Sequence, residues 1–280
     1  YPTAFLTVII LAVTVVTVYY RWPRPVEVHF IDVGQGDAAL IMTPRRQAVL
    51  IDSGGTAGSD FDIGERVVLP YLKHQGVRRL ESLILTHGHE DHAGGAAAVL
   101  RSMPVGTLII AQDAASPAVQ AALRSFTGTV VPAHFGQEII VDGVRFTVVH
   151  AATAHAANNN ETSIVIRVNY GNHSFLFTGD LPASGEHELV RKGLAACTVL
   201  KVAHHGAKTS TSQEFLQAAA PKYAIISVGA NNRFGHPHPE VVQRLEQSGA
   251  KIYRTDHHGA VVFTTDGVRL TVSHFIEVSK

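Results

Sequence analysis

The sequence is poor in cysteine and in charge. Cys197 is the only cysteine among 280 residues, which excludes an internal disulfide and a metal site built on several thiolates. We interpret it as a buried thiol with no chemical role. Lysine and arginine together number 23, as do aspartate and glutamate, so the formal net charge is zero. No overall charge attracts a polyanion, and any attraction to nucleic acid must come from local patches or bound cations.

Hydrophobic residues make up 46% of the chain and charged residues only 16%, which favours a folded protein with a sizeable core over a disordered one. The length suits one large domain or two modest ones. Histidine is the unusual component, because 17 are present.

One long apolar stretch lies near the start of the chain. Residues 4–20, AFLTVIILAVTVVTVYY, hold no charge and precede Arg21, Trp22 and Arg24. A membrane span needs about 20 apolar residues, and aromatic residues suit its ends. We expect residues 1–22 to be the end of a transmembrane helix of a longer protein, and residues 23–280 to form one soluble domain. A signal peptide is the alternative, but no small-residue cleavage site follows.

After this stretch, short apolar strands alternate with amphipathic helices. The helical spacing predicts helices over residues 62–75, 93–102, 116–125, 184–192, 211–219 and 239–248. The heptapeptide DGVRFTV at 142–148 recurs as DGVRLTV at 266–272. Two strand-rich halves with interspersed helices predict a pseudo-duplicated sandwich of two sheets, with helices on its outer faces.

The segment LTHGHEDHAGG, residues 85–95, follows a buried strand and crowds histidines and acids into one turn. Such a turn packs poorly but supplies metal ligands. The spacing lets His87 and His89 face one cation while Asp91 and His92 face a second. A solvated polar turn is the alternative reading.

Five further segments occur with this motif in a fixed order. They are FIDVGQGDAALI (30–41), VLIDSGG (49–55), FLFTGD (175–180), LKVAHHGAKTS (200–210) and NNRFGHPHPEVVQRL (231–245). Together the segments resemble the metallo-β-lactamase superfamily, and most of all the C-terminal domain of ComEC DNA-uptake channels of competent bacteria. The resemblance implies an α/β fold of αββα type, with two mixed sheets flanked by helices.

The resemblance also implies roles for single residues. Asp180 stands where the superfamily places a carboxylate that bridges two metals. In VAHHG, the ligand position before glycine favours His205, which leaves His204 to contact substrate or donate a proton to the leaving group. Asp52 occupies a position that orients a metal-binding histidine. Asp37 has either a similar supporting part or a purely structural one in a glycine turn.

One position departs from the superfamily pattern. The register puts Asn159 where a third histidine of the first metal site usually stands, and His150 or His155 could substitute. An ordinary asparagine-rich loop is an equal alternative.

Three other histidine positions are less clearly assigned. His236, in FGHPHPE, could reach the metals or the scissile phosphate, while His238 suits a helix N-cap. The pair His257 and His258 matches no motif, and we place it on the surface.

Two divalent cations, with manganese favoured and zinc possible, would activate water and offset charge on a phosphodiester. The resemblance therefore implies a metal-dependent nuclease that acts on single- or double-stranded DNA, with Asp91, Asp180, His204 and His236 in the catalytic centre. Lys201, Lys208 and Arg233 are candidate phosphate-binding residues.

By resemblance, the enzyme degrades the strand that is not imported, together with the membrane channel part of the same protein and the competence DNA-uptake machinery. That role implies the extracytoplasmic side of the cell membrane, although the arginines after residue 20 favour the cytoplasmic side. The alternatives are another hydrolase of the same fold, acting on a phosphocholine ester, a lactam or a thioester, and a degenerate module that only binds DNA.

Overall fold

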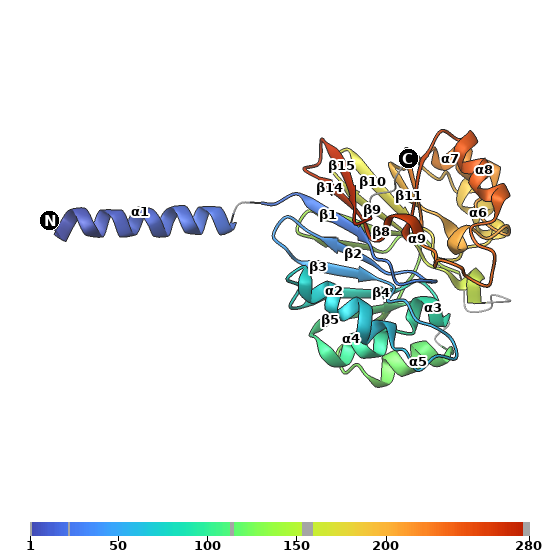
Figure 1. The fold of residues 1–280 in the computed structure, drawn as a ribbon, viewed down its shortest axis with the longest axis horizontal. Coiled ribbons are helices and arrows are strands. Elements are labelled where there is room, and N and C mark those ends of the chain that lie inside the picture. Colours follow the sequence, from blue (N-terminus) through green and yellow to red (C-terminus); the bar gives the residue numbers. More distant parts are fainter. Residues whose placement is uncertain (1, 22, 113–114, 153–158, 277–280) are drawn as a thin grey trace.

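The structure, a computed structural model, describes residues 2–21, 23–112, 115–152 and 159–276, and of residues 2–4, 15–21 and 159 only the backbone. Within these residues the strands form one sheet of eight and one of seven. The two sheets stack face to face, and helices cover their outer faces (Figure 1). This arrangement confirms the predicted sandwich of two sheets between helices.

The first sheet has the strand order β15-β14-β1-β2-β3-β4-β5-β6. Its strands are β1 (Val26–Phe30), β2 (Ala39–Met42), β3 (Ala48–Ile51), β4 (Leu80–Leu85), β5 (Val105–Ile110), β6 (Thr129–Pro132), β14 (Val261–Thr265) and β15 (Leu270–His274). Neighbours from β15 to β3 pair antiparallel, and those from β3 to β6 pair parallel, so the sheet is mixed as expected.

The second sheet, of order β13-β12-β11-β10-β9-β8-β7, repeats this plan. Its strands are β7 (Glu138–Val141), β8 (Val144–His150), β9 (Val165–Tyr170), β10 (His173–Phe177), β11 (Val199–Lys201), β12 (Tyr223–Ile226) and β13 (Lys251–Arg254). Pairing is antiparallel from β7 to β10 and parallel from β10 to β13. The two DGVR repeats form the turns of the hairpins β7–β8 and β14–β15.

Helices cover the outer face of each sheet (Figure 1). On the first sheet lie α2 (Leu69–His74), which continues a π-helical turn at Gly64–Val68, α4 (Ala96–Ser102) and α5 (Pro117–Arg124). On the second lie α6 (Ala183–Arg191), α7 (Gln213–Ala219) and α8 (Pro239–Gln247). Each lies within or beside a segment where helical spacing predicts a helix. Short turns α3 (Glu90–Ala93), η2 (Asn159–Thr162), η3 (Ala203–Gly206) and α9 (Thr255–His258) complete the helices.

The core has three apolar layers, one between the sheets and one under each set of helices. Aromatic rings bridge the sheets in the central layer, where Phe30 of β1 stacks on Phe177 of β10 with centroids 5.5 Å apart. Burying a side chain of this size contributes about 1.5–3 kcal/mol. The central layer therefore fixes the relative position of the two sheets, and with it the loops at their edge.

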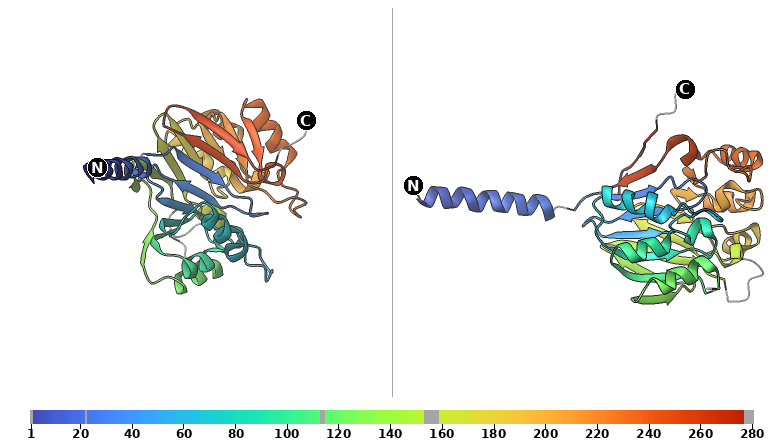
Figure 2. Two further views of the ribbon diagram at one scale, coloured as in Figure 1. Left: turned by 60° about the vertical axis from the view of Figure 1, so that its left-hand side comes forward. Right: turned by 60° about the horizontal axis from the view of Figure 1, so that its bottom comes forward.

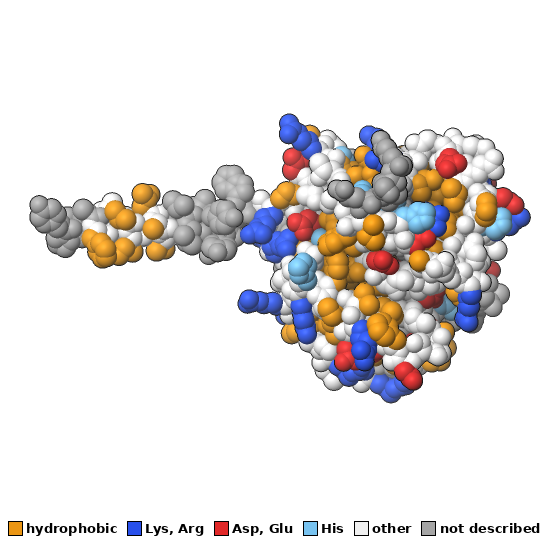
Figure 3. Space-filling view, viewed as in Figure 1, with side chains coloured by type: hydrophobic (Ala, Val, Ile, Leu, Met, Phe, Trp, Pro, Cys, Tyr) orange, Lys and Arg blue, Asp and Glu red, His pale blue; other side chains and the backbone are white. Residues whose placement is uncertain are grey.

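Helix α1 (Pro2–Arg21) extends away from the two sheets, as two further views show (Figure 2). Its residues 5–14 are exposed, and hydrophobic side chains gather along them (Figure 3). Among the helices in the described residues, none combines the length and the apolar character that crossing a membrane requires. The prediction of a transmembrane helix over residues 1–22 is therefore not supported.

Candidate metal centre

The histidine-rich turn follows the buried strand β4. His87 and His92 are 1% and 0% exposed, and His89 lies just before the short helix α3. Gly95 lets this turn pack closely, because a Cβ there would lie 2.3 Å from the Ser53 carbonyl oxygen. The sequence thus turns polar side chains inward at the end of an apolar strand.

Asp180 reaches the same place from the second sheet, three residues beyond the end of β10. Gly179 has a φ of 53°, a left-handed conformation that glycine adopts without strain. The backbone N–H of Asp180 donates to Ser163 Oγ over 3.2 Å. The carboxylate is 1% exposed, so the turn directs a charged group into the interior between the sheets.

His204 and His205 lie in the turn η3 that follows β11. Both have left-handed backbones, with φ of 52° and 54°. This conformation costs a residue with a side chain roughly 1–2 kcal/mol, and such strain tends to be kept at functional sites. The turn directs the two rings differently: His205 is 1% exposed, whereas the His204 side chain is 27% exposed.

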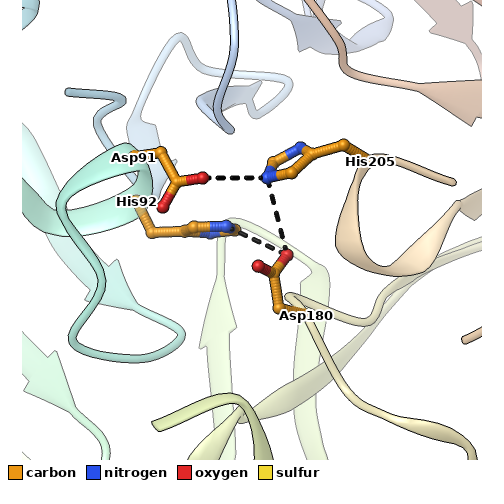
Figure 4. Close-up of side chains that lie close together, drawn as sticks. All are labelled: Asp91, His92, Asp180 and His205. Atoms are coloured by element: carbon orange, nitrogen blue, oxygen red, sulfur yellow. Dashed lines mark hydrogen bonds and ion pairs between the residues drawn. The ribbon is translucent and has the colours of Figure 1, made fainter. Parts of the chain in front are cut away.

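These elements bring two sets of ligand atoms together, and Asp180 belongs to both. One set is Asp91, His92, Asp180 and His205, the other His87, His89 and Asp180; within each, the ligand atoms lie within 4.8 Å of one another. Figure 4 shows the first set, in which side chains from α3, the loop after β10 and η3 point toward a common centre. The predicted ligands of the two cations are therefore brought together, each in its expected set.

Hydrogen bonds fix which ring nitrogen of each histidine faces Asp180. His205 Nδ1 donates to the Ser227 carbonyl oxygen over 2.9 Å, and His92 Nδ1 donates to Asp52 Oδ2 over 2.9 Å. Carbonyl and carboxylate oxygens only accept, so both Nδ1 atoms carry a proton. In the neutral ring the Nε2 lone pair then points into the centre, which is the orientation of a metal-binding histidine.

His87 is oriented in the same way through a hydroxyl group. Thr86 Oγ1 donates to Asp52 Oδ2 over 2.7 Å, and it lies 3.2 Å from His87 Nδ1. Because the threonine proton is already used, its oxygen accepts from His87. Thr86 is thus a supporting residue that the sequence did not single out, although it directly precedes the motif.

Buried atoms without partners are consistent with a centre that holds cations. Among the described residues, His87 Nε2, His92 Nε2 and Asp180 Oδ1 are buried and accept or donate no hydrogen bond. His92 Nε2 lies 3.0 Å from Asp180 Oδ1, so a lone pair faces a carboxylate oxygen. Such an arrangement costs several kcal/mol unless a cation lies between the atoms. The imidazole and carboxylate donors fit two divalent ions that share Asp180.

In the metal-free protein, protons partly replace such cations. Burial alone would lower the pKa of His205, but the charges of Asp180 and Asp37 raise it to about 9. The pKa of His92 is raised well above its usual range against the same burial, chiefly by Asp180 and Asp37. Burial and the charge on His92 hold the pKa of His87 well below its usual range.

The carboxylates respond in the opposite sense. Burial would raise the pKa of Asp91, but the hydrogen bond from His205 and the charge of His92 lower it to about 2. The pKa of Asp180 lies well below its usual range, because His92 and His205 outweigh its burial. Both carboxylates are therefore ionised at neutral pH, as ligands must be.

Asp37 and Asp52 lie behind the ligands, as their expected supporting part requires. Asp37 Oδ2 is 3.5 Å from His92 Nδ1 and forms an ion pair with Lys201. Lys201 is 3% exposed and donates to the Gly179 carbonyl oxygen over 3.3 Å. The interpretation of Lys201 as a phosphate-binding cation is therefore wrong, because it is buried beneath the centre and neutralises Asp37.

The predicted third ligand of the first site, Asn159, is not tested by the structure. The Asn159 side chain lies outside the described residues, as does all of His155. His150 is described, but it lies on β8, where Glu188 and Lys192 are the charges acting on it. The neighbouring Asn160 lies beside the centre: its Oδ1 is buried without a partner in the described structure, and its Nδ2 lies 3.5 Å from His204 Nδ1.

Backbone contacts place the segment after Asn160 beside the centre. Ser163 Oγ accepts from the N–H of Asp180, and the N–H of Ile164 donates to the Thr86 carbonyl oxygen over 2.8 Å. Sequence register alone is uncertain by one residue within NNN, so it could not decide between neighbouring asparagines.

A cavity of 570 Å³ opens above the centre. It is lined by Gln35, Gly55, Thr56, Ala57, His89, Glu90, Asp91, Asp180, His204, Asn232, Arg233 and Phe234. Arg233 lines the cavity, which is the location expected of a phosphate-binding residue. Lys208 does not line the cavity: it is exposed and pairs with Glu240 Oε1 at 2.7 Å, so the expectation that it binds phosphate is not supported.

The remaining histidines take varied places. The His236 ring lies 5.6 Å from that of His204, and burial together with His204 and His205 lowers its pKa to about 4. His238 caps α8 by accepting from the N–H of Glu240 over 3.3 Å, which confirms the predicted N-cap. In α9, His257 is exposed as expected, while His258 is only partly so.

Comparisons with known sequences agree with this centre. The family model of the metallo-beta-lactamase superfamily matches residues 31–230. ComE operon protein 3 of Bacillus subtilis is 36% identical over 85% of this chain and 33% of its own length. Competence protein ComA of Neisseria gonorrhoeae is 36% identical over 83% of this chain and 31% of its own length. Recombination protein 2 of Haemophilus influenzae is 34% identical over 90% of this chain and 31% of its own length. The chain thus spans about a third of the length of these curated relatives.

Solved structures show the same fold at low sequence identity. The metallo-beta-lactamase fold protein YhfI from Bacillus subtilis is 12% identical, with a TM-score of 0.56 over 86% of this chain and 99% of its own. The CmlA beta-hydroxylase E377D mutant is 13% identical, with a TM-score of 0.58 over 86% of this chain and 54% of its own. The fold, the paired ligand sets and the match over residues 31–230 agree, and the chain belongs to the metallo-beta-lactamase superfamily.

Proposed function

We propose that this protein is a metal-dependent phosphodiesterase that cleaves DNA. The observation that carries the proposal is the pair of ligand sets sharing Asp180 on the floor of an open cavity, with Arg233 on its wall. When bound, two divalent ions supply an acidified water and offset negative charge on phosphate oxygens. A phosphodiester is the substrate that needs both effects at once.

The chain itself contributes binding and proton transfer. Arg233 is placed to hold a phosphate next to the one attacked. His204 lines the cavity with Nε2 3.7 Å from Asp180 Oδ2, and burial lowers its pKa. It is our candidate to hydrogen-bond the substrate, or to donate a proton to the leaving oxygen once the charge of a bound phosphate favours its protonated form. His236, with a pKa of about 4, stays neutral at pH 7 and holds the His204 ring in place from the side.

For the metal we propose manganese over zinc. We place the unpartnered amide oxygen of Asn160 where three-histidine sites have an imidazole, and the described ligand sets contain no thiolate. Harder oxygen donors shift selectivity toward manganese, although zinc binds more tightly to most sites.

By similarity to the competence proteins, we propose that the enzyme degrades the strand that is not imported. It would act with the membrane channel part of the same protein and the DNA-uptake machinery, on the extracytoplasmic side of the cell membrane. Protease added to intact cells should then digest the domain without lysis. Protection until lysis would contradict this location.

A hydrolase of small esters is the second candidate, favoured by the cavity volume, which lies in the range of small-molecule sites. The test incubates the full chain with end-labelled single- and double-stranded DNA, a phosphocholine ester, a lactam and a thioester, each with chelator, manganese or zinc. We expect DNA to be cleaved in the presence of manganese, and not in the presence of chelator or zinc.

The matched variants are Asp180→Asn and Asp266→Asn. Both keep the side-chain size, but Asp266 lies in an exposed turn of the β14–β15 hairpin. Asp180→Asn should lose at least a thousandfold in kcat, while Asp266→Asn should match the wild type. Full activity of Asp180→Asn, or hydrolysis of a small ester with intact DNA, would refute the nuclease proposal. Metal-independent DNA binding without cleavage would favour the degenerate binding module.

A further inference from the structure

An exposed aromatic ring stands at the mouth of the catalytic cavity. Phe234 is 54% exposed and lines the cavity together with Arg233, whose guanidinium carbon lies 5.1 Å from the centroid of the phenylalanine ring. Leaving such a ring in water forgoes part of the roughly 1.5–3 kcal/mol that burial would contribute. The ring is thus more than half exposed at the entrance to the centre, with a cation beside it.

The loop that carries Phe234 is held in place by one side chain. Asn232 Oδ1 accepts from the backbone N–H groups of Phe234 and His236, over 3.2 and 3.0 Å. Its Nδ2 donates to the carbonyl oxygens of Gly229 and His236, over 2.9 and 2.6 Å. The loop also contacts η3, where the N–H of His238 donates to the Gly206 carbonyl oxygen over 2.8 Å. The exposed ring is therefore preorganised, which lowers the entropy cost of binding.

A row of rings leads from this face to the metal ligands. The Phe234 and His236 rings stack at 5.7 Å with 24° between their planes, and His236 meets His204 at 5.6 Å. His204 Nε2 in turn lies 3.7 Å from Asp180 Oδ2. The ring of His236 thus links Phe234 to His204, which lies beside Asp180.

We propose that Phe234 is a stacking platform for an unpaired nucleobase, which makes single-stranded DNA the substrate of this site. The inference rests on the proposed nuclease function and names its substrate class. Arg233 would hold the phosphate that joins the stacked nucleotide to the next one. Stacking on an aromatic side chain accepts any base, because every base has a π face.

One feature argues against a duplex at this platform. The base faces of a duplex are already stacked on one another, so none is open to Phe234. Because Arg233 is the single lysine or arginine among the described residues lining the cavity, binding here depends on stacking as well as on phosphate charge. The site therefore suits one flexible strand that can place a base beside the scissile phosphate.

The test compares Phe234→Ala and Phe234→Trp with Phe135→Ala. Phe135 is a matched control, because it is 57% exposed and has the Lys192 ammonium 4.8 Å from its ring centroid, but it does not line the cavity. Each variant of the full chain is assayed with manganese on a mixed-sequence single strand, on the same length of abasic strand, and on the matching duplex. Metal content and thermal unfolding are measured in parallel.

We expect Phe234→Ala to raise KM for the normal single strand about tenfold, which corresponds to 1.4 kcal/mol. Its KM for the abasic strand, its kcat and its metal content should match the wild type, and Phe234→Trp should bind the normal strand at least as well. Equal KM values for Phe234→Ala and the wild type on the normal strand would overturn the inference. An equal rise on the abasic strand or the duplex would overturn it too.

Failure of the proposed function gives a different result. If the wild type cleaves none of the three substrates, the nuclease proposal is wrong. The same oligonucleotides are then followed by fluorescence anisotropy with manganese present. A tenfold weaker Kd of Phe234→Ala for the normal strand alone would still establish the platform, and equal Kd values would refute it.

Discussion

At the scale of single residues, the centre depends on the direction of each histidine ring. His205 is tied through Nδ1 to Ser227, so its Nε2 points at Asp91 and Asp180. The exposed ring of His204 has no comparable bond to a backbone carbonyl among the described residues. Two adjacent histidines in one turn therefore have different expected roles.

We predict that His205→Ala loses bound metal and that His204→Ala retains it but cleaves at least tenfold more slowly. The reason is that, of these two histidines, His205 belongs to a ligand set with Asp91 and Asp180 and His204 does not. Metal per chain, measured by mass spectrometry after gel filtration, checks the first part, and kcat on single-stranded DNA checks the second. Retention of metal by His205→Ala together with its loss from His204→Ala would reverse the assignment.

A second prediction concerns Asn160. Asn160→His should raise the zinc retained per chain, because an imidazole is a stronger zinc ligand than an amide oxygen. Asn172→His is the control, since Asn172 lies in the exposed turn between β9 and β10. Zinc is measured after dialysis of both variants. Equal zinc contents would show that the Asn160 side chain does not face a metal.

The sequence indicated which side chains would lie together at the centre, because crowded histidines and acids at strand ends have few other uses. His87, His89, Asp91, His92, Asp180 and His205 all reach the predicted sets. The sequence did not predict that Lys201 is buried. A lysine at the end of an apolar strand gives the same sequence pattern whether its ammonium group contacts solvent or a buried carboxylate. That outcome depends on Asp37, 164 positions away in a loop of the other sheet.

At the scale of elements, the turn η3 is the most constrained part of the site. Two left-handed histidines precede Gly206, which has a φ of 82°. A Cβ on Gly206 would lie 2.6 Å from Pro237 Cβ. The glycine therefore serves both the backbone conformation and the close approach of the loop that carries Phe234.

We predict that Gly206→Ala lowers the free energy of unfolding by about 2–4 kcal/mol, of which about 1–2 comes from the left-handed backbone and the rest from crowding against Pro237. Gly193→Ala is the matched control, because Gly193 has a φ of 83° but no atom near its Cβ. It should lose only the backbone part. Urea unfolding of both variants measures the difference in the free energy of unfolding. Equal losses would mean that the loop carrying Pro237 shifts away from the added methyl group without a free-energy cost.

Periodicity predicted nearly every regular element, because the amphipathic helices lie on the outer faces and the strands are buried. It did not predict β6, whose residues Thr129–Pro132 are exposed or half-buried at a sheet edge and show no alternation. It also missed η3, since left-handed histidines have no sequence signature comparable to that of glycine. The order of strands within each sheet was not predicted, because neighbours such as β1 and β14 are far apart in the chain.

At the scale of the whole molecule, each half of the chain supplies ligands that the other lacks. His87, His89, Asp91 and His92 follow the first sheet, and Asp180 and His205 follow the second. A bound cation is therefore a cross-link between the sheets. Binding that occurs only in the folded state stabilises that state, so metal should raise the melting temperature.

The metal-free protein should show a characteristic pH dependence. The pKa of His205 is raised to about 9 from 6.5, so its stabilising contribution is complete below about pH 6.5 and is lost as the pH rises to about 9. The pKa values of His87, His204 and His236 are lowered in the fold. Their neutral forms are favoured by folding, so stability also falls as the pH drops below about 6.5.

We therefore predict that the melting temperature in chelator is highest near pH 6.5 and several degrees lower at pH 9. Manganese should remove most of the loss at pH 9, because the metal takes the place of the dissociated protons. Thermal unfolding at pH 5.5, 6.5 and 9, with chelator and with manganese, checks this. A metal-free protein that is most stable at pH 9 would contradict the assigned histidine shifts.

The charges along the cavity have one more consequence. Glu90, Asp91 and Asp180 line it, and Arg233 is the one lysine or arginine among the described lining residues. Protons on His92 and His205 offset part of this negative charge in the metal-free centre, and bound divalent cations would offset more of it. If the proposed function is correct, the cation would therefore aid the entry of a polyanion as well as its cleavage. Newly made enzyme would then leave the nucleic acid around it intact until it reached a compartment that supplies the metal ion. The availability of metal would control when the enzyme becomes active.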